Sequence, residues 1–282
     1  MNPIRSILMH LDDSPACAAR LRAANAIGEA LDANVTALYA VLPAFMQYAM
    51  AYSAGAEMAP MMQTFEQERH ARTRALFDAT VGSGTAKHLK RIEWTEGVGE
   101  PAASFAAQAL VADLLVLGQH VEPADAPAGV TSDFNESVLI ASGKPALVVP
   151  AIYRCEPIGR IALVAWKPTR EAARALSAAL PFLQRAEQVH LVQWSEPDAG
   201  LDDAAGPDVE ASLRRHGVTA IMHRDVAKSR DVGELLLSRA ADLGADLLVM
   251  GCYGHSRARE WALGGASRSV LQSMTVPVLM SH

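Results

Sequence analysis

The stretch GCYGHSRAREWALGG, residues 251–265, follows a short apolar run, LLVM, and precedes a helix-like run, ASRSVLQSM. Glycine lets backbone N–H groups come close to an anion, and a helix start adds unpaired donors and the positive end of a dipole. This pattern predicts a loop that holds phosphate. Its candidate backbone and hydroxyl donors are Gly251, Gly254, Gly264, Gly265 and Ser267.

Cationic side chains are expected close to this loop. Arg257 lies within the stretch, and a guanidinium makes charge-assisted hydrogen bonds to phosphate. Lys167 follows an earlier apolar run, ALVAW. Because ligands of open parallel α/β sheets bind outside the carboxyl ends of the strands, we expect Lys167 to approach the same phosphate.

The chain repeats itself in two halves, which must position these residues. ILMHLDDSPACAARLRAA, from Ile7, is matched by ALVAWKPTREAARALSAA, from Ala162. Further on, ADLLVLGQH is matched by ADLLVMGCY, and SGKPALVVP by SMTVPVLMSH. Three matches in the same order indicate a duplication. We therefore expect one domain over residues 1–150 and a second over residues 151–282.

Apolar strand-like runs alternate with helical patterns in both halves, which is typical of a parallel sheet covered on both faces. Ser14 is expected to cap the first helix. The predicted fold class is α/β, with two similar open, mostly parallel five-stranded Rossmann-like domains, and the closing strands of the two halves could pair within one chain. The expected strands are 7–11, 35–41, 88–94, 114–117 and 146–149, then 161–165, 189–192, 219–223, 247–250 and 276–280.

Composition excludes several classes of protein. Half of the 282 residues are hydrophobic and 20% are charged, which fits a globular chain with an ample core. No apolar run approaches the roughly 18 residues of a membrane span, so we expect a cytoplasmic protein. The net charge of −6 gives no basic face for nucleic acid, and its acidity lies wholly in residues 1–150.

The glycine spacing and the duplicated strand–helix units resemble the universal stress protein family over both halves. Nucleotide-binding members of that family carry G-x2-G-x9-G followed by Ser or Thr after the fourth strand, and an Asp after the first. Asp12 stands at that Asp position in the first half. The resemblance implies five-stranded domains of the adenine-nucleotide alpha-hydrolase-like type, pairing into a dimer-like unit, with ATP or AMP as the ligand.

The two halves depart from the family pattern in different places. In the second half, Lys167 replaces the Asp, and Gly265 stands where a hydroxyl residue is usual. In the first half Asp12 is retained, but of the glycines only Gly118 remains, and Asp133 adds negative charge nearby. We therefore expect the ligand mainly in the second half, with Asp12 as a weaker candidate.

Three functions remain open at this stage. The first is a stress-response regulator that binds an adenine nucleotide or another phosphorylated ligand, and the second is an interaction protein with degenerate sites. The third is a weak ATP hydrolase, although no nucleophile elbow or evident general base assigns a catalytic residue. The histidines lack carboxylates at ligand spacing, so no metal is expected. The ligand, assembly into a homodimer and the role of residues 46–62 remain open.

Overall fold

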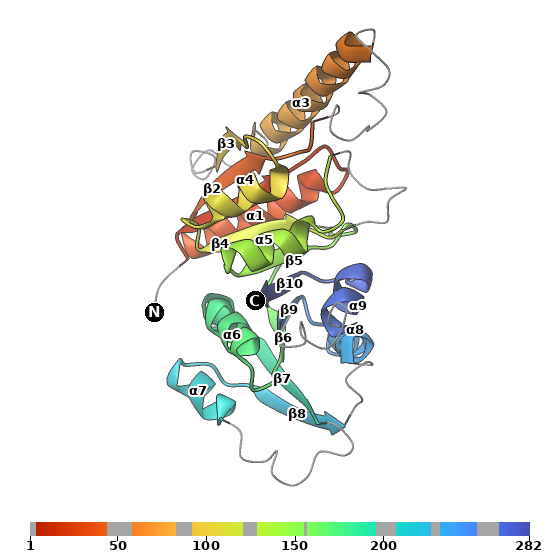
Figure 1. Ribbon diagram of the computed structural model, residues 1–282. Helices are drawn as coiled ribbons and strands as arrows, with labels where there is room; N and C mark the ends of the chain where they lie inside the picture. The colour runs from red at the N-terminus through yellow and green to blue at the C-terminus, as the bar shows by residue number, and fades with distance from the viewer. Residues whose placement is uncertain are drawn as a thin grey trace. The chain divides into compact units, whose positions relative to one another are not determined.

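The computed structural model describes residues 4–43, 58–82, 92–120, 129–154, 157–195, 207–226, 232–252 and 265–282 (Figure 1). The chain divides into two compact units, Ile4–Ser142 and Gly143–His282, called here the first and the second unit. In the parts of the chain just given, no helix is both long and apolar enough to cross a membrane.

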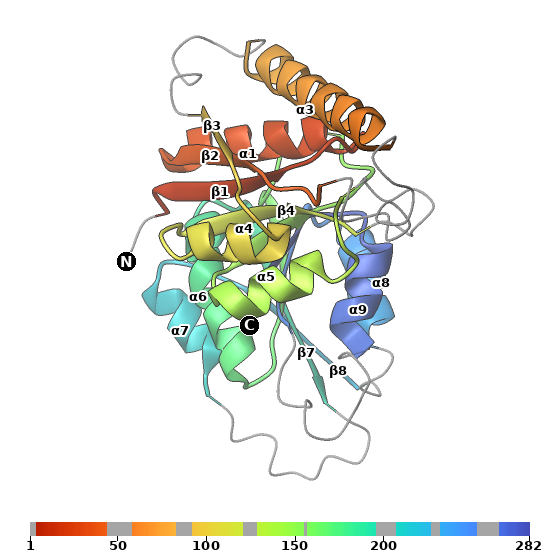
Figure 2. The ribbon, with the colours of Figure 1, turned by 45° about the horizontal axis from the view of Figure 1, so that its top comes forward.

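The first unit contains a parallel sheet with the strand order β3-β2-β1-β4. Helices α1 and α3 pack together on one face, and α4 and α5 pack together on the other (Figure 2). Its strands are β1 (Ser6–Leu11), β2 (Asn34–Tyr39), β3 (Ile92–Glu96) and β4 (Leu114–Gly118), and its helices are α1 (Cys17–Leu31), α3 (Met58–Gly82), α4 (Pro101–Ala109) and α5 (Phe134–Ser142).

The second unit has the strand order β5-β10-β9-β6-β7-β8, in which the β5–β10 pair is antiparallel and the other pairs are parallel. Helix α6 packs on β9 and β10, and α8 packs on α9. Its strands are β5 (Ala146–Val149), β6 (Ile161–Ala165), β7 (Gln188–Ser195), β8 (Ile221–Val226), β9 (Leu247–Gly251) and β10 (Val278–Ser281), and its helices are α6 (Arg170–Leu183), α7 (Val209–Arg215), α8 (Val232–Asp242) and α9 (Gly265–Ser273).

The α/β fold class predicted from the alternating pattern is confirmed. Strands β4, β5, β9 and β10 are apolar and buried almost throughout, as expected where helices cover both faces of a parallel sheet. The expected pairing of the closing strands is also confirmed, because Val278 of β10 lies opposite Val148 of β5.

Three local predictions were wrong. Strand β8 begins at Ile221 rather than at residue 219, because Gly217, with φ +75°, turns the chain and pairing with β7 starts only at Ile221. Strand β3 continues to Glu96, since it pairs with β2 as far as Tyr39. Helix α1 begins at Cys17 without a side-chain cap, because its N-cap position is Ala16 and the Ser14 side chain is hydrogen-bonded to the Asp12 carboxylate.

Replacing Phe105 tests the core of the first unit. Its ring is fully buried and packs edge-on against His10 and Phe134. We expect Phe105→Ala to lower the free energy of unfolding by about 3–5 kcal/mol, through lost burial and a cavity. Val111→Ala, at a position 84% exposed, should change it by less than about 0.5 kcal/mol in the same urea titration. Equal effects of the two substitutions would contradict this placement of the core.

Candidate functional site

The carboxyl ends of β6 and β9 lie next to each other in the second unit. The two strands are parallel and pair from Ala162 opposite Leu247 to Val164 opposite Val249. Strand β6 also pairs with β7 on its other side, so the chain leaves β6 and β9 in opposite directions along the sheet. Such a divergence is where ligands bind in open α/β sheets. Gly251 ends β9 at this edge.

Gly251 lies directly against the first turn of α6. A Cβ atom placed on Gly251 would be 2.5 Å from the backbone nitrogen of Ala172 and 2.7 Å from the carbonyl carbon of Glu171. A side chain of any kind is therefore excluded unless α6 moves. The glycine brings the end of a strand against the start of a helix, where backbone N–H groups lack intrahelical partners.

Two side chains of opposite charge stand beside this contact. Lys167 follows β6 and is exposed, and Thr169 caps α6 by accepting a hydrogen bond from the N–H of Ala172 over 3.3 Å. Glu171, in contrast, is only 2% exposed and accepts a hydrogen bond from the Nε of Arg170. The sequence analysis predicted Lys167 here and missed Glu171.

Helix α9 begins at Gly265, immediately after the glycine-rich stretch. Ser267 is buried in its first turn, and the next residue, Arg268, is exposed. The helix is held close to α8, because a Cβ on Gly233 would lie 2.8 Å from the Cβ of Ser269. The predicted site residues Gly254, Gly264 and Arg257 lie outside the described residues, so their roles remain predictions.

The equivalent edge of the first unit lies between β1 and β4, and it contains a buried ion pair. Asp12 follows β1 and is 1% exposed, and one of its carboxylate oxygens lies 2.8 Å from the terminal nitrogen of Arg20. Arg20, from α1, is itself only 3% exposed. The N–H of Ser14 donates to the other Asp12 oxygen over 3.0 Å.

The guanidinium of Arg20 also lies over Gly118, the residue that ends β4. A Cβ atom on Gly118 would overlap the second terminal nitrogen of Arg20, at 1.9 Å. Any larger residue at Gly118 would therefore displace the guanidinium of Arg20. Asp12 follows β1, and its role in ligand binding stays a prediction; Arg20, a charged residue on the buried, alanine-rich face of α1, was not predicted.

Burial and neighbouring charges shift the pKa values of the groups in this cluster. Burial alone would raise the pKa of Asp12, but Arg20, His10 and the Ser14 hydrogen bonds together hold that pKa below its usual range. Burial lowers the pKa of His10 from 6.5 to about 4. Burial raises the pKa of the Cys17 thiol. At neutral pH, the cluster thus contains a carboxylate, a guanidinium, a neutral imidazole and a thiol.

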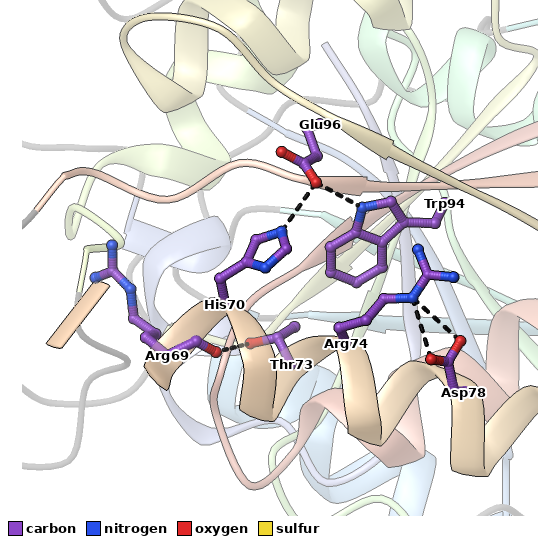
Figure 3. A network of polar contacts seen from close by, with 7 residues as sticks. All are labelled: Arg69, His70, Thr73, Arg74, Asp78, Trp94 and Glu96. Atoms are coloured by element: carbon purple, nitrogen blue, oxygen red, sulfur yellow. Dashed lines mark hydrogen bonds and ion pairs between the residues drawn. The ribbon is translucent and has the colours of Figure 1, made fainter. Parts of the chain in front are cut away.

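A second polar cluster in the first unit connects α3 to the ends of β2 and β3 (Figure 3). Glu96 accepts hydrogen bonds from the His70 ring over 2.9 Å and from the Trp94 indole over 3.1 Å. The Tyr39 ring stacks on Trp94 at 5.5 Å between centroids. Arg74 pairs with Asp78 along the helix, which is a charged surface pair. These contacts hold α3 on the sheet.

The fold and these edges define a class: an α/β protein with two related units, each with a potential ligand edge where β-strand connections diverge. The chain belongs to the universal stress protein family, because the model of the Universal stress protein family matches residues 3–150 and again residues 160–282. No curated protein matches the chain.

Solved structures of similar fold span the whole chain. A universal stress protein from Archaeoglobus fulgidus has 16% sequence identity and a TM-score of 0.63, and the alignment covers 97% of each chain. A putative universal stress protein from Pseudomonas aeruginosa has 15% identity and a TM-score of 0.58, over 98% of this chain and 92% of the other. At these identities the likeness concerns the fold.

Substituting Gly251 tests the close contact with α6. We expect Gly251→Ala to lower the free energy of unfolding by about 1–3 kcal/mol, because the added methyl group overlaps the helix backbone. Gly82→Ala is the matched control, since nothing lies within 4 Å of its Cβ position at the end of α3. Thermal unfolding of the two variants measures the difference, and an unchanged Gly251→Ala would show that α6 does not press on β9.

The pKa of His10 predicts acid sensitivity of the first unit. The pKa of about 4 in the folded chain lies below the ordinary histidine value of 6.5, so near pH 5 the unfolded chain binds a proton that the folded chain excludes. The contribution to stability is complete above about pH 6.5 and is lost as pH falls toward 4, by about 2–3 kcal/mol. His10→Gln should flatten this dependence in urea unfolding between about pH 4 and 7. An equally steep profile in the variant would refute the assignment to His10.

Proposed function

We propose that this universal stress protein binds a phosphorylated ligand in its second half, at the carboxyl ends of β6 and β9, and acts as a cytoplasmic stress-response regulator through that binding. An adenine nucleotide, ATP or AMP, is the first candidate. The observation that carries the proposal is the packing of Gly251 on the first turn of α6, next to the exposed Lys167.

The helix dipole and Lys167 favour an anion at this edge, whereas the buried carboxylate of Glu171 opposes one and is partly compensated by its ion pair with Arg170. The N-terminus of α6 presents the positive end of a helix dipole, and Lys167 adds a full positive charge two residues before the cap Thr169. Lys167 is exposed, so its ammonium group is accessible to a ligand. The predicted donors of the glycine-rich stretch, Gly254, Gly264 and Arg257, would complete the phosphate contacts, with Gly265 and Ser267 at the start of α9.

Lys167 stands where the family pattern has an Asp, and this difference bears on adenine binding more than on phosphate binding. Asp12 of the first half has Lys167 as its counterpart in the duplicated sequence, so the second half has a cation where the family pattern has a carboxylate. Binding through phosphate is thus better supported than recognition of the base. A non-nucleotide interaction protein is the alternative that this departure favours.

Ligand binding by Lys167 variants tests the proposal. We expect Lys167→Ala to weaken binding of ATP or AMP about 10- to 100-fold, because a charge-assisted hydrogen bond to phosphate is lost, and Lys167→Asp to weaken it further. Equilibrium dialysis of the full chain with labelled ATP, AMP and inorganic phosphate measures this. Arg185→Ala, which removes an exposed charge just beyond the opposite end of α6, is the control and should bind like the wild type.

The outcomes distinguish the two candidate functions. Binding that is lost on substitution of Lys167 and retained on substitution of Arg185 supports the phosphate site. Absence of binding for all three ligands would favour the interaction protein. Binding that is equally strong in the Lys167 variants would place the ligand elsewhere.

A further inference from the structure

Arg20 is a full positive charge buried at the point in the first unit where a ligand is expected. Strands β1 and β4 are parallel neighbours, and β2 lies on the other side of β1, so the connections diverge between β1 and β4. Asp12 and Gly118 directly follow and end these two strands. The guanidinium contacts the carboxylate of Asp12 and covers Gly118. It therefore occupies the edge at which an outside molecule would bind.

We propose that the carboxyl ends of β1 and β4 form a guanidinium-binding site, which Arg20 fills from within the chain. The site is closed to other ligands as long as Arg20 is present. Of the two strand edges described, only the one in the second half is then open to a ligand, a consequence that rests on the proposed function.

The guanidinium is buried beside a buried carboxylate, which compensates its charge. Moving a guanidinium out of water costs several kcal/mol unless a charged partner compensates. Asp12 supplies that charge from a position that is 1% exposed, and the N–H of Ser14 keeps its second oxygen in place. His10 is neutral at physiological pH, because burial lowers its pKa to about 4, and so adds no competing positive charge.

Because Gly118 has no side chain, there is room for the guanidinium of Arg20 beside it. The terminal nitrogen of Arg20 takes the volume of a Cβ atom at Gly118, so an alanine there would force the guanidinium to move. In the second half the corresponding glycine, Gly251, approaches the backbone of α6 instead. The counterpart of Arg20 in the duplicated sequence is Ala175, a small buried residue, so no arginine at that position covers Gly251.

Chemical rescue tests the proposal without any nucleotide. Arg20→Ala leaves the Asp12 carboxylate and a cavity of guanidinium shape, so the variant should be less stable than the wild type. We expect guanidinium, at about ten times its dissociation constant, to raise the Tm of Arg20→Ala by roughly 3–6 °C. Urea, which is planar but uncharged, and methylammonium, which is charged but not planar, should give less than about a third of that shift at equal concentration.

Two further variants control the experiment. Arg22→Ala removes an exposed arginine from the same helix and should show no guanidinium-dependent stabilisation. Asp12→Asn combined with Arg20→Met removes both charges, so it should be more stable than Arg20→Ala and insensitive to guanidinium. If Arg20→Ala does not fold in buffer, recovery of its circular dichroism spectrum by guanidinium, and not by urea or methylammonium, is the supporting result.

Equal responses of Arg20→Ala to guanidinium, urea and methylammonium, or a guanidinium response that persists in the double variant, would overturn the proposal. Because no phosphorylated ligand enters this assay, its failure is independent of the dialysis result on Lys167. Guanidinium rescue together with absent nucleotide binding would leave the first site assigned and the proposed function wrong.

Discussion

One steric feature occurs twice in the structure: the fourth strand of each half ends in a glycine, and another group takes the space that a side chain would fill. At Gly118 the space is taken by the guanidinium of Arg20, and at Gly251 by the backbone at the start of α6. In both places, a glycine lets a polar group approach the end of a strand more closely than any other residue allows. Both halves of the duplicated sequence thus have the glycine, but the group that packs against it differs between them.

The charges at the two edges are consequently different. In the first half, a buried carboxylate and a buried guanidinium compensate each other, which stabilises the unit only because both are present. In the second half an exposed ammonium, Lys167, stands at the position of that carboxylate, and a buried carboxylate, Glu171, lies in the first turn of the helix. Of the two edges, the first has a buried ion pair between Asp12 and Arg20, and the second has the exposed ammonium group of Lys167.

The strands and the fold class were predictable because continuous apolar runs such as LLVLG and LLVM are buried on both faces of a parallel sheet. The positions of Asp12, Lys167 and Gly251 at the strand ends followed from the same pattern. Arg20 and Glu171 could not be assigned, because a charged residue on a helix is normally solvated and its burial depends on a partner brought close by the sheet. The start of α1 was missed for a similar reason, since the Ser14 side chain hydrogen-bonds the Asp12 carboxylate and the N-cap position falls at Ala16.

Of the two strand edges described, we infer that only the one in the second half is open to a ligand, because Arg20 fills the other. The most direct measurement is native mass spectrometry of the full-length protein with an adenine nucleotide added in excess, which counts the ligands bound to each chain. If only the second half binds a ligand, we expect one bound nucleotide per chain in the wild type and none in Lys167→Asp. Two nucleotides per wild-type chain, or one that survives in Lys167→Asp, would contradict it.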